Sequence, residues 1–299
     1  MKIGLIGLGK MGQAIAYRLS KNNFEIIAFD PKVSQIDDVE NISFESSLND
    51  VTQKTNIIWV MVPAGDITDN VIKDLSKLLK PESIVIDGGN SNFENTKKRY
   101  SLLKEKNIHL LDCGTSGGIA GKINGYSLMI GGDKEIFENT KKIFKAIAAP
   151  NGFNYMGPSG AGHYVKMIHN GIEYSLLQSY AEGFDLLKNN SNYENLDLEK
   201  ISDTWLHGSV IRSWILELCK SVFNQDQELK SISGSIGENQ TGRWTLKEAE
   251  KENISMKLLK EALNIRTESR QTGGNFGTKV VAMLRNKFGG HEVKKLIKN

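Results

Sequence analysis

Four polar side chains lie along one stretch with a helical pattern, and their chemical types and spacing would allow proton transfer. When they are plotted at about 100° per residue, four residues fall within roughly 100° of one another: Lys166, His169, Asn170 and Glu173. An amine, an imidazole, an amide and a carboxylate on one stripe can move protons and orient a substrate. An ordinary solvated helix face is the alternative. Gly171 argues against it, because a glycine inside a helix costs about 1 kcal/mol relative to alanine and close approach of another group would explain it.

A glycine-rich turn near the N-terminus has the spacing of a dinucleotide-binding site. It runs through Gly7-Leu8-Gly9-Lys10-Met11-Gly12, after a short apolar run and before a helical pattern. Such a turn allows a pyrophosphate to approach the backbone at a helix N-terminus. The alternative is a glycine-rich turn that binds nothing. Asp30 ends the second apolar run, where a carboxylate binds ribose hydroxyls and repels a 2′-phosphate, so we expect NAD, with NADP as the alternative because Lys32 lies nearby.

Further loops follow other apolar runs, and ligands bind at such strand ends in open α/β sheets. Val62-Pro63-Ala64 is expected to cover the dinucleotide, although a simple turn explains it equally well. Asp87–Ser91 contains Asn90, and Cys113–Gly118 contains Ser116, Gly117 and Gly118. Their glycines would expose backbone N–H groups, while Asn90 and Ser116 offer polar side chains.

The elements that must position these residues change character along the chain. Seven β-rich runs are expected as strands: Ile3–Ile6, Glu25–Asp30, Asn56–Val62, Ser83–Asp87, His109–Cys113, Ser127–Ile130 and Phe153–Met156. They alternate with helical stretches, including Lys134–Ala148, which is typical of parallel βαβ units in a doubly wound Rossmann-like sheet. A long helix from 161 to 187 follows the break at Pro158–Gly162, and Val165, Ile168, Ile172 and Leu176 form an apolar stripe beside its polar face. We therefore predict an α/β nucleotide-binding domain over 1–160 and an all-α domain for substrate binding and dimerisation over 161–299.

Composition limits the class of protein. The 299 residues are 39% hydrophobic and 24% charged, with two cysteines and a formal charge of +3. This predicts a soluble, cytoplasmic protein with neither membrane segment nor disulfide framework, and no nucleic-acid partner. His163 and His169 lie on different helix faces, so no metal site is expected. We expect structural roles for His109 and His207 and a core position for Cys113.

At this point the motifs resemble those of the 6-phosphogluconate dehydrogenase family, within the wider β-hydroxyacid dehydrogenase group. The likeness covers essentially the whole chain. It is carried by the motifs GLGKMG (7–12), DGGNS (87–91), SGG (116–118), GHYVKMIHNGIEY (162–174), TGRWT (241–245) and RNKFGGH (285–291). The chain is similar to a shorter form that lacks much of the long form's C-terminal helical domain.

The resemblance implies oxidative decarboxylation of 6-phosphogluconate to ribulose 5-phosphate and CO2 with NAD, in the pentose phosphate pathway and gluconate utilisation, without a metal. Lys166 would be the general base and Glu173 the acid that protonates C1, with His169 and Asn170 beside them. The other implied substrate contacts are Asn90, Ser116, Gly117, Gly118, Tyr174, Arg243, Arg266, Arg285 and His291, of which Tyr174, Arg266, Arg285 and His291 would hold the phosphate. The cofactor contacts would be Gly7, Leu8, Gly9, Lys10, Met11, Gly12, Asp30, Val62, Pro63, Ala64 and Asn90.

The chain departs from the long form at one loop. That form has K-G-T-G-K-W where this chain has Asn239-Gln240-Thr241-Gly242-Arg243-Trp244, which leaves the contacts of the loop open. A homodimer or homotetramer is implied, with the C-terminal segment near the neighbouring site, and whether Arg285 and His291 act in cis or in trans stays open. The alternatives are another β-hydroxyacid dehydrogenase, acting on a 3-hydroxyisobutyrate-like substrate without decarboxylation, and a non-catalytic NAD-binding protein.

Overall fold

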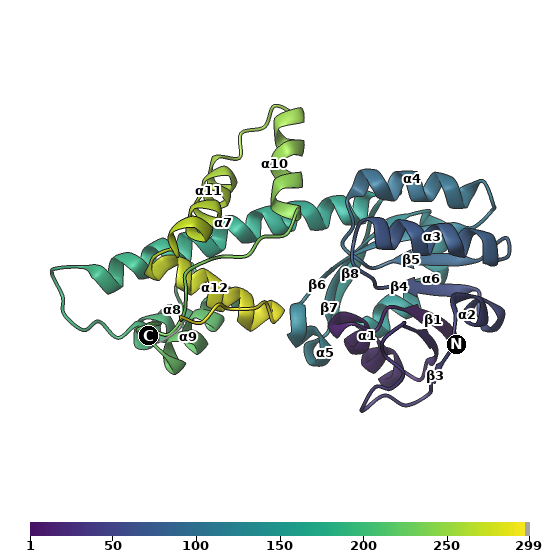
Figure 1. The fold of residues 1–299 in the computed structure, drawn as a ribbon, viewed down its shortest axis with the longest axis horizontal. Coiled ribbons are helices and arrows are strands. Elements are labelled where there is room, and N and C mark those ends of the chain that lie inside the picture. The colour runs from purple at the N-terminus through teal and green to yellow at the C-terminus, as the bar shows by residue number, and fades with distance from the viewer. Residues whose placement is uncertain (297–299) are drawn as a thin grey trace. The chain divides into compact units, whose positions relative to one another are not determined.

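The structure, a computed structural model, describes residues 1–296 of the chain (Figure 1). The chain forms two compact units, of which the first covers residues 1–167 and the second begins at Ile168. The long helix α7 (Ala161–Asn189) contributes to both units. The boundary expected at 160/161 coincides with the start of this helix, whereas the two units divide within it.

The first unit is built on one eight-stranded sheet. Its strands are β1 (Lys2–Ile6), β2 (Glu25–Phe29), β3 (Ile42–Phe44), β4 (Ile57–Val60), β5 (Ile84–Asp87), β6 (His109–Ser116), β7 (Tyr126–Gly132) and β8 (Ala148–Gly157). They lie in the order β3-β2-β1-β4-β5-β6-β7-β8, and every neighbouring pair is parallel except β6 and β7. The chain leaves β1 toward β2 on one side and returns to β4 on the other, and ligands bind at the carboxyl ends of strands where the order reverses in this way.

Helices cover both faces of this sheet. They are α1 (Lys10–Lys21), α2 (Leu48–Lys54), α3 (Asp66–Leu78), α4 (Phe93–Lys104), the short η1 (Gly118–Ala120) and α5 (Gly121–Asn124), and α6 (Lys134–Ile147). One core cluster joins α1 and α6 to side chains such as Leu5 and Trp59, and another joins α2, α3 and α4 to Ile58 and Val60. Because successive strand residues point to opposite faces, the continuous apolar runs fill both clusters. The predicted doubly wound sheet is confirmed.

Two features of the sheet differ from the expectation. All seven predicted strands are present, but β7 runs antiparallel to β6 rather than in a parallel βαβ unit. Residues 117–125 between them are too few for a parallel crossover, which needs a dozen or more residues, so the chain must reverse. The three-residue edge strand β3 was not predicted, because Ile42–Phe44 is too short to show a period.

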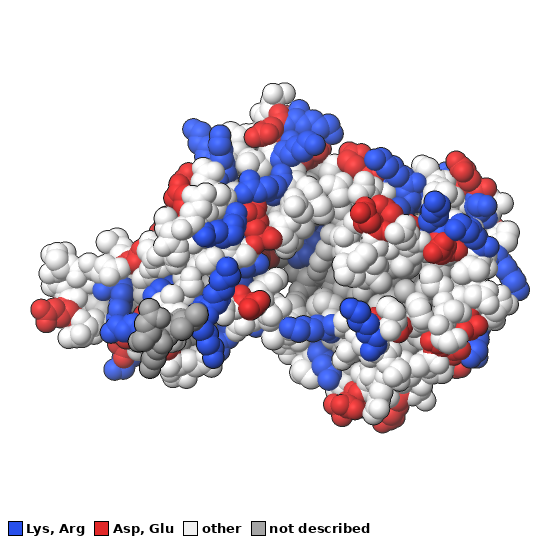
Figure 2. All heavy atoms as spheres, in the orientation of Figure 1, with Lys and Arg blue, Asp and Glu red and all other residues white. Residues whose placement is uncertain are grey.

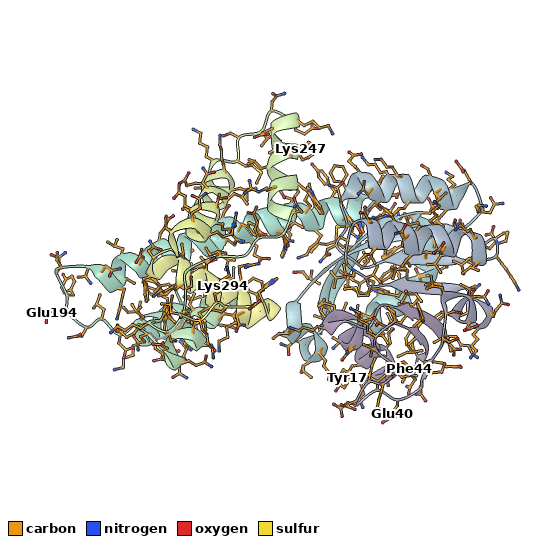
Figure 3. The ribbon with its side chains drawn as sticks, viewed as in Figure 1. Tyr17, Glu40, Phe44, Glu194, Lys247 and Lys294 are labelled. Carbon is orange, nitrogen blue, oxygen red and sulfur yellow. The ribbon has the colours of Figure 1, made fainter. Side chains whose placement is uncertain are left out.

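The second unit is helical. After α7 come α8 (Leu198–Leu206), α9 (Trp214–Gln225), α10 (Thr241–Lys251), α11 (Lys257–Thr272) and α12 (Phe276–Gly289). Its larger core cluster packs Leu177, Ala181 and Phe184 of α7 against α9 and α12. The predicted all-α character after α7 is thereby confirmed. In Figure 3, Glu194 lies in the segment between α7 and α8, Lys247 on α10 and Lys294 beyond α12.

The apolar stripe expected on α7 is not a core face. Ile172 is 52% exposed and Leu176 is 46% exposed, whereas Tyr174 and Leu177 are buried. The helical period identified a stripe, but burial depends on which face α10, α11 and α12 cover. Gly171 does allow close packing as predicted, since a Cβ on it would lie 2.7 Å from Cγ2 of Thr245.

Charged residues are intermingled on the surface. Figure 2 shows lysine and arginine interspersed with aspartate and glutamate over the visible face, in keeping with the small net charge. Within residues 1–296, no helix is long and apolar enough to cross a membrane.

Candidate active site

The turn between β1 and α1 has the shape that its glycine pattern predicts. Gly7 has a φ of +93°, and a Cβ on it would lie 2.5 Å from the carbonyl oxygen of Met61. A Cβ on Gly12 would lie 2.0 Å from the carbonyl oxygen of Gly7, so the helix can pack on the turn only without that atom. Around Gly9, no described atom beyond its chain neighbours lies within 4 Å of such a Cβ. The N-terminus of α1 therefore has room for an anionic diphosphate.

Asp30 closes the same turn from the end of β2. Its Oδ2 accepts a hydrogen bond from the backbone N–H of Leu8 at 2.8 Å, and its Oδ1 accepts one from the N–H of Lys32 at 2.8 Å. Lys10 and Met11 open α1 directly after the turn. The Asp30 carboxylate thus ties the end of β2 to the glycine turn.

Two further loops follow β4 and β5. In the segment Val62–Ala64, the carbonyl oxygen of Pro63 accepts a hydrogen bond from Thr68 Oγ1 at 2.9 Å. After β5, the carboxamide of Asn90 accepts from the backbone N–H of Thr115 at 2.8 Å and donates to the carbonyl of Thr115 at 3.0 Å. Asn90 thus ties its loop to β6 with both ends of its amide.

The carboxyl end of β6 carries the SGG motif. Ser116 is the last residue of the strand, and Gly117 and Gly118 follow with φ values of +138° and +55°, which glycine adopts far more readily than other residues. β1, β4, β5 and β6 are parallel neighbours, so the loops after all four lie along one edge of the sheet. The structure therefore brings the predicted cofactor residues and the SGG motif to the same edge of the first unit.

A buried ion pair behind these loops was missed by the sequence analysis. Asp87 is fully buried, and its Oδ2 accepts a hydrogen bond from Nη1 of Arg99 at 2.9 Å, while Arg99 Nε pairs with Asp69 at 2.7 Å. His163 lies 3.1 Å from the Asp87 carbonyl oxygen through Nε2 and 2.8 Å from Thr96 Oγ1 through Nδ1. His163 thus links the start of α7 to β5 and α4. Asp87 belongs to a glycine motif that could have drawn attention to it, whereas Arg99 carries no local signal.

Lys166 is held where α7 meets the sheet. Asp112 of β6 is fully buried and accepts hydrogen bonds from the backbone N–H of Gly160 at 2.7 Å and of His163 at 2.9 Å, so a strand carboxylate caps the helix. A Cβ on Gly114 would lie only 2.4 Å from Cβ of Lys166. The lysine stem therefore lies directly on the backbone of β6, and the residue is 5% exposed.

In the second unit, α7 continues the polar stripe. His169 Nδ1 lies 3.1 Å from Oδ1 of Asn170, whose Nδ2 donates to Oγ1 of Thr241 at 3.2 Å. His169 Nδ1 also lies 4.0 Å from Glu173 Oε2. Asn170 is buried, while the side chains of His169 and Glu173 are partly exposed. The predicted grouping of imidazole, amide and carboxylate is present, and Thr241 joins it.

Two arginines of this unit are buried, Arg266 at 1% and Arg285 at 7% exposure. The guanidinium of Arg266 stacks on the Tyr174 ring at 3.5 Å, and neither of its Nη atoms has a hydrogen-bond partner among the described residues. The pKa of Arg266 is lowered to about 10, chiefly by burial and in part by the positive charge of Arg285, while Tyr174 acts in the opposite direction. Burial also lowers the pKa of Arg285. Two neighbouring buried cations favour an anion as their missing partner.

The remaining predicted substrate residues have partners of their own. Arg243 pairs with Glu238 at 2.8 Å, and Arg270 pairs with the same carboxylate at 3.0 Å, so Glu238 already neutralises part of this charge. His291 follows α12, and its ring makes an edge contact with Phe288, the centroids being 6.2 Å apart. Arg243 is thus far less available to an anion than Arg266.

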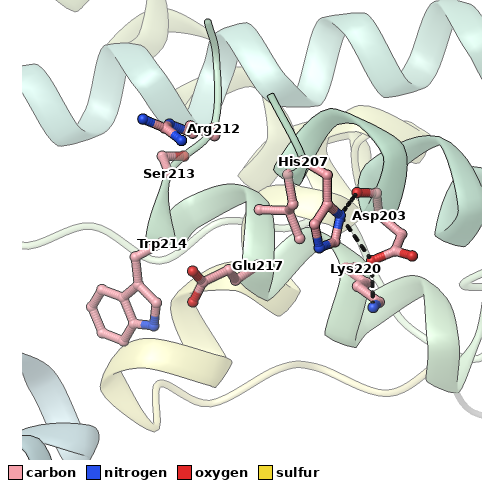
Figure 4. Close-up of a pocket in the computed structure, with 8 residues that line it drawn as sticks. Asp203, His207, Arg212, Ser213, Trp214, Glu217 and Lys220 are labelled. Carbon is pink, nitrogen blue, oxygen red and sulfur yellow. Dashed lines mark hydrogen bonds and ion pairs between the residues drawn. The ribbon is translucent and has the colours of Figure 1, made fainter. Parts of the chain in front are cut away.

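A pocket of about 480 Å³ lies in the second unit beside α8 and α9 (Figure 4). Its lining residues are Asp203, Leu206, His207, Arg212, Ser213, Trp214, Glu217 and Lys220. Lys220 pairs with Asp203 at 2.6 Å, and His207 lies 3.8 Å from Asp203, so several of these charges neutralise one another. None of the predicted site residues lines this pocket. Across residues 1–296 no three histidine, cysteine, aspartate or glutamate side chains gather as metal ligands would.

Comparison with known proteins gives matches along the chain. Residues 2–157 match the model of the NAD binding domain of 6-phosphogluconate dehydrogenase, and residues 162–296 match that of the 6-phosphogluconate dehydrogenase C-terminal domain. The NAD(+)-dependent, decarboxylating 6-phosphogluconate dehydrogenase of Haloferax volcanii is 40% identical over 300 residues, which cover 98% of this chain and 98% of that protein.

Solved structures support the same relationship. Plasmodium falciparum 6-phosphogluconate dehydrogenase, solved in apo form and in complex with NADP+ and with 6-phosphogluconate, matches with a TM-score of 0.82 at 29% identity, covering 91% of this chain and 62% of that one. A Mycobacterium tuberculosis 3-hydroxyisobutyrate dehydrogenase shares the fold, with a TM-score of 0.76 at 18% identity over 95% of this chain and 99% of that one. The two family models and the 40% identity to a relative of the same length place this chain in the 6-phosphogluconate dehydrogenase family.

Proposed function

We propose that the chain oxidises and decarboxylates 6-phosphogluconate to ribulose 5-phosphate and CO2 with reduction of NAD, a reaction of the pentose phosphate pathway. The observation that carries this proposal is the pair of buried guanidinium groups of Arg266 and Arg285. An unphosphorylated hydroxy acid would leave these cations without a partner at the far end of the substrate. A phosphate would satisfy them, because arginine presents a fork of donors that matches its oxygens.

The chain's own residues then have the following roles. Lys166 takes the proton from the substrate 3-hydroxyl. A bound NAD would supply the acceptor for the hydride that leaves C3. The resulting β-keto acid loses CO2 while protonated Lys166 stabilises the enolate oxygen that develops. Glu173 then protonates C1 of the enediol. Asn170 and His169 orient the substrate beside Lys166.

The cofactor would lie along the sheet edge of the first unit. The backbone around Gly9 would receive the pyrophosphate, Asp30 the ribose hydroxyls, and the Val62–Ala64 loop the outer side of the dinucleotide. Open space at Gly9 and the position of Asp30 on the turn support this fit. We propose NAD as the preferred cofactor because the Asp30 carboxylate would repel the 2′-phosphate of NADP.

We propose the following substrate contacts. Asn90 and the SGG motif would approach the carboxylate and hydroxyls, while Tyr174, Arg266, Arg285 and His291 would hold the phosphate. We also propose that the enzyme works in the cytosol as a homo-oligomer. Exposed apolar side chains on the second unit support an oligomer, and they are Ile172, Leu176, Ile211 and Trp214.

A direct assay tests the proposal. Purified protein is mixed with NAD and 6-phosphogluconate, and NADH absorbance and CO2 release are followed together, with gluconate and 3-hydroxyisobutyrate as control substrates. We expect equal amounts of NADH and CO2 from the phosphorylated acid and far less of either from the controls. NADH without CO2, or a preference for 3-hydroxyisobutyrate, would reject the proposal.

A matched variant tests the base. Lys166→Met should abolish turnover and leave the Kd for NAD nearly unchanged, because the lysine acts on the substrate hydroxyl and not on the dinucleotide. Residual turnover close to that of the unchanged protein would show that another group removes the proton.

A further inference from the structure

One carboxamide oxygen in the second unit receives hydrogen bonds from two different parts of the candidate site. Oδ1 of Asn239 accepts from the hydroxyl of Tyr174 at 2.7 Å, and from Oγ1 and the backbone N–H of Thr241 at 2.5 and 3.2 Å. Tyr174 and Thr241 are both buried, whereas Asn239 itself is exposed. A buried hydroxyl needs an acceptor, and here a single surface residue supplies it for two of them.

The chemistry of the amide fixes the direction of these hydrogen bonds. A carbonyl oxygen can only accept, so the hydroxyl hydrogens of Tyr174 and Thr241 both point toward Asn239. The Thr241 oxygen is then left as an acceptor, and it receives the Nδ2 hydrogen of Asn170 at 3.2 Å. This turns Oδ1 of Asn170 toward Nδ1 of His169, 3.1 Å away. The orientation of the Asn170 amide thus follows from the acceptor at residue 239.

The hydrogen bonds at Asn239 form two branches, one through Thr241 to Asn170 and the other to Tyr174. The Tyr174 branch leads to the proposed phosphate site at Arg266. The Tyr174 ring lies under the Arg266 guanidinium at 3.5 Å, and the bond from its hydroxyl to Asn239 limits how the ring can turn or shift. The same oxygen therefore orients a group beside the proposed proton-transfer residues and a group beneath the proposed phosphate site.

We propose that Asn239 is a positioning residue that aligns Asn170, through Thr241, and Tyr174 for the two ends of one substrate. This inference rests on the proposed function, since it assigns Asn170 to the reacting end and Tyr174 to the phosphate end. The two branches should affect different kinetic constants. Loss of the Asn170 branch lowers kcat, and loss of the Tyr174 branch raises KM for 6-phosphogluconate.

Three variants test the inference in the complete chain with NAD and 6-phosphogluconate. Asn239→Leu keeps the size of the side chain and removes the acceptor, Asn239→Asp keeps the acceptor, and Gln240→Leu is the matched control. Gln240 is the next residue, is also exposed, and its side chain does not cap α10. We expect Asn239→Leu to lower kcat about tenfold and to raise KM about tenfold. A tenfold effect is what the loss of one hydrogen bond in each branch would cause. Asn239→Asp should recover most of kcat and keep a raised KM, because its charge repels the substrate phosphate.

A double substitution separates the branches. In a Tyr174→Phe background the bond to Asn239 is already absent, so Asn239→Leu should raise KM no further and should still lower kcat. If the unchanged protein is active and Asn239→Leu has the same kcat and KM as Gln240→Leu, this inference is overturned. The proposed function would then still stand. Equal losses of kcat in Asn239→Leu and Asn239→Asp also overturn it, because the acceptor would then be irrelevant. An unchanged protein that yields no NADH refutes the proposed function and the inference together.

Discussion

Arg266→Met is expected to make the ligand-free protein more stable, although it removes a large buried side chain. Arg266 is 1% exposed, and neither of its Nη atoms has a hydrogen-bond partner within residues 1–296. Burial lowers its pKa from the ordinary arginine value to about 10. At about 1.4 kcal/mol for each unit of pKa, keeping the charge in the folded state costs about 3 kcal/mol.

The pH dependence of this cost follows from the direction of the change in pKa. Below a pH of about 10 the arginine is protonated in both the folded and the unfolded protein, so the whole cost is present. Between a pH of about 10 and the ordinary pKa of arginine, the unfolded chain holds a proton that the folded chain has released, and stability rises with pH. At neutral pH methionine removes the full cost but also loses the contact with the Tyr174 ring, worth about 2 kcal/mol when desolvated. We expect a net gain of about 1 kcal/mol, unchanged from about pH 7 to 9.

Chemical denaturation followed by tryptophan fluorescence, with and without 6-phosphogluconate, measures the effect. The unchanged protein should gain stability from the ligand, and Arg266→Met should gain almost none. Arg243→Met is the matched control, because this exposed arginine pairs with Glu238 at the surface and its loss should change stability by less than about 1 kcal/mol. A loss of about 3 kcal/mol or more in Arg266→Met would mean that a protein group partners the guanidinium, and would refute the anion site.

Three further predictions follow from single contacts. Gly114→Ala should lower kcat at least tenfold with little change in the Kd for NAD, because its Cβ would lie 2.4 Å from Cβ of Lys166; an unchanged kcat would place the lysine elsewhere. Gly171→Ala should lower the free energy of unfolding by about 1–3 kcal/mol despite the better helix propensity of alanine, since its Cβ would lie 2.7 Å from Thr245 Cγ2. In the Gly171→Ala background, Thr245→Ser removes that methyl group. Chemical denaturation should show that it restores most of the lost free energy of unfolding. Asp30→Ser should shift the ratio of kcat/KM toward NADP by about tenfold or more, and a ratio that stays constant would contradict the proposed basis of cofactor choice.

Much of the fold and part of the site could be predicted from local patterns. The glycine turn of residues 7–12, the acid at the end of the second strand and the polar stripe of α7 all involve residues close together in the chain. Their relative positions follow from strand and helix geometry alone. Resemblance to a known family added roles for Arg266 and Arg285, which no local pattern marks as special.

Other features could not be predicted, because they depend on how distant segments pack. The pairing of Asp87 with Arg99 joins a strand end to a helix, and the dependence of Lys166 on Gly114 joins α7 to β6. The exposure of Ile172 also follows only from which face of α7 the later helices cover.

The sequence alone determined which residues could do chemistry and the order of the elements that carry them. This is because hydrophobic periodicity and turn preferences depend on residues that are close together in the chain. Only the tertiary structure decided which of those side chains already have partners. It paired Arg243 with Glu238, and it left the two Nη atoms of buried Arg266 without a hydrogen-bond acceptor among the described residues. The physical reason is that desolvation and hydrogen bonding depend on all the groups around a side chain. The spacing of residues along the chain does not show which groups those are.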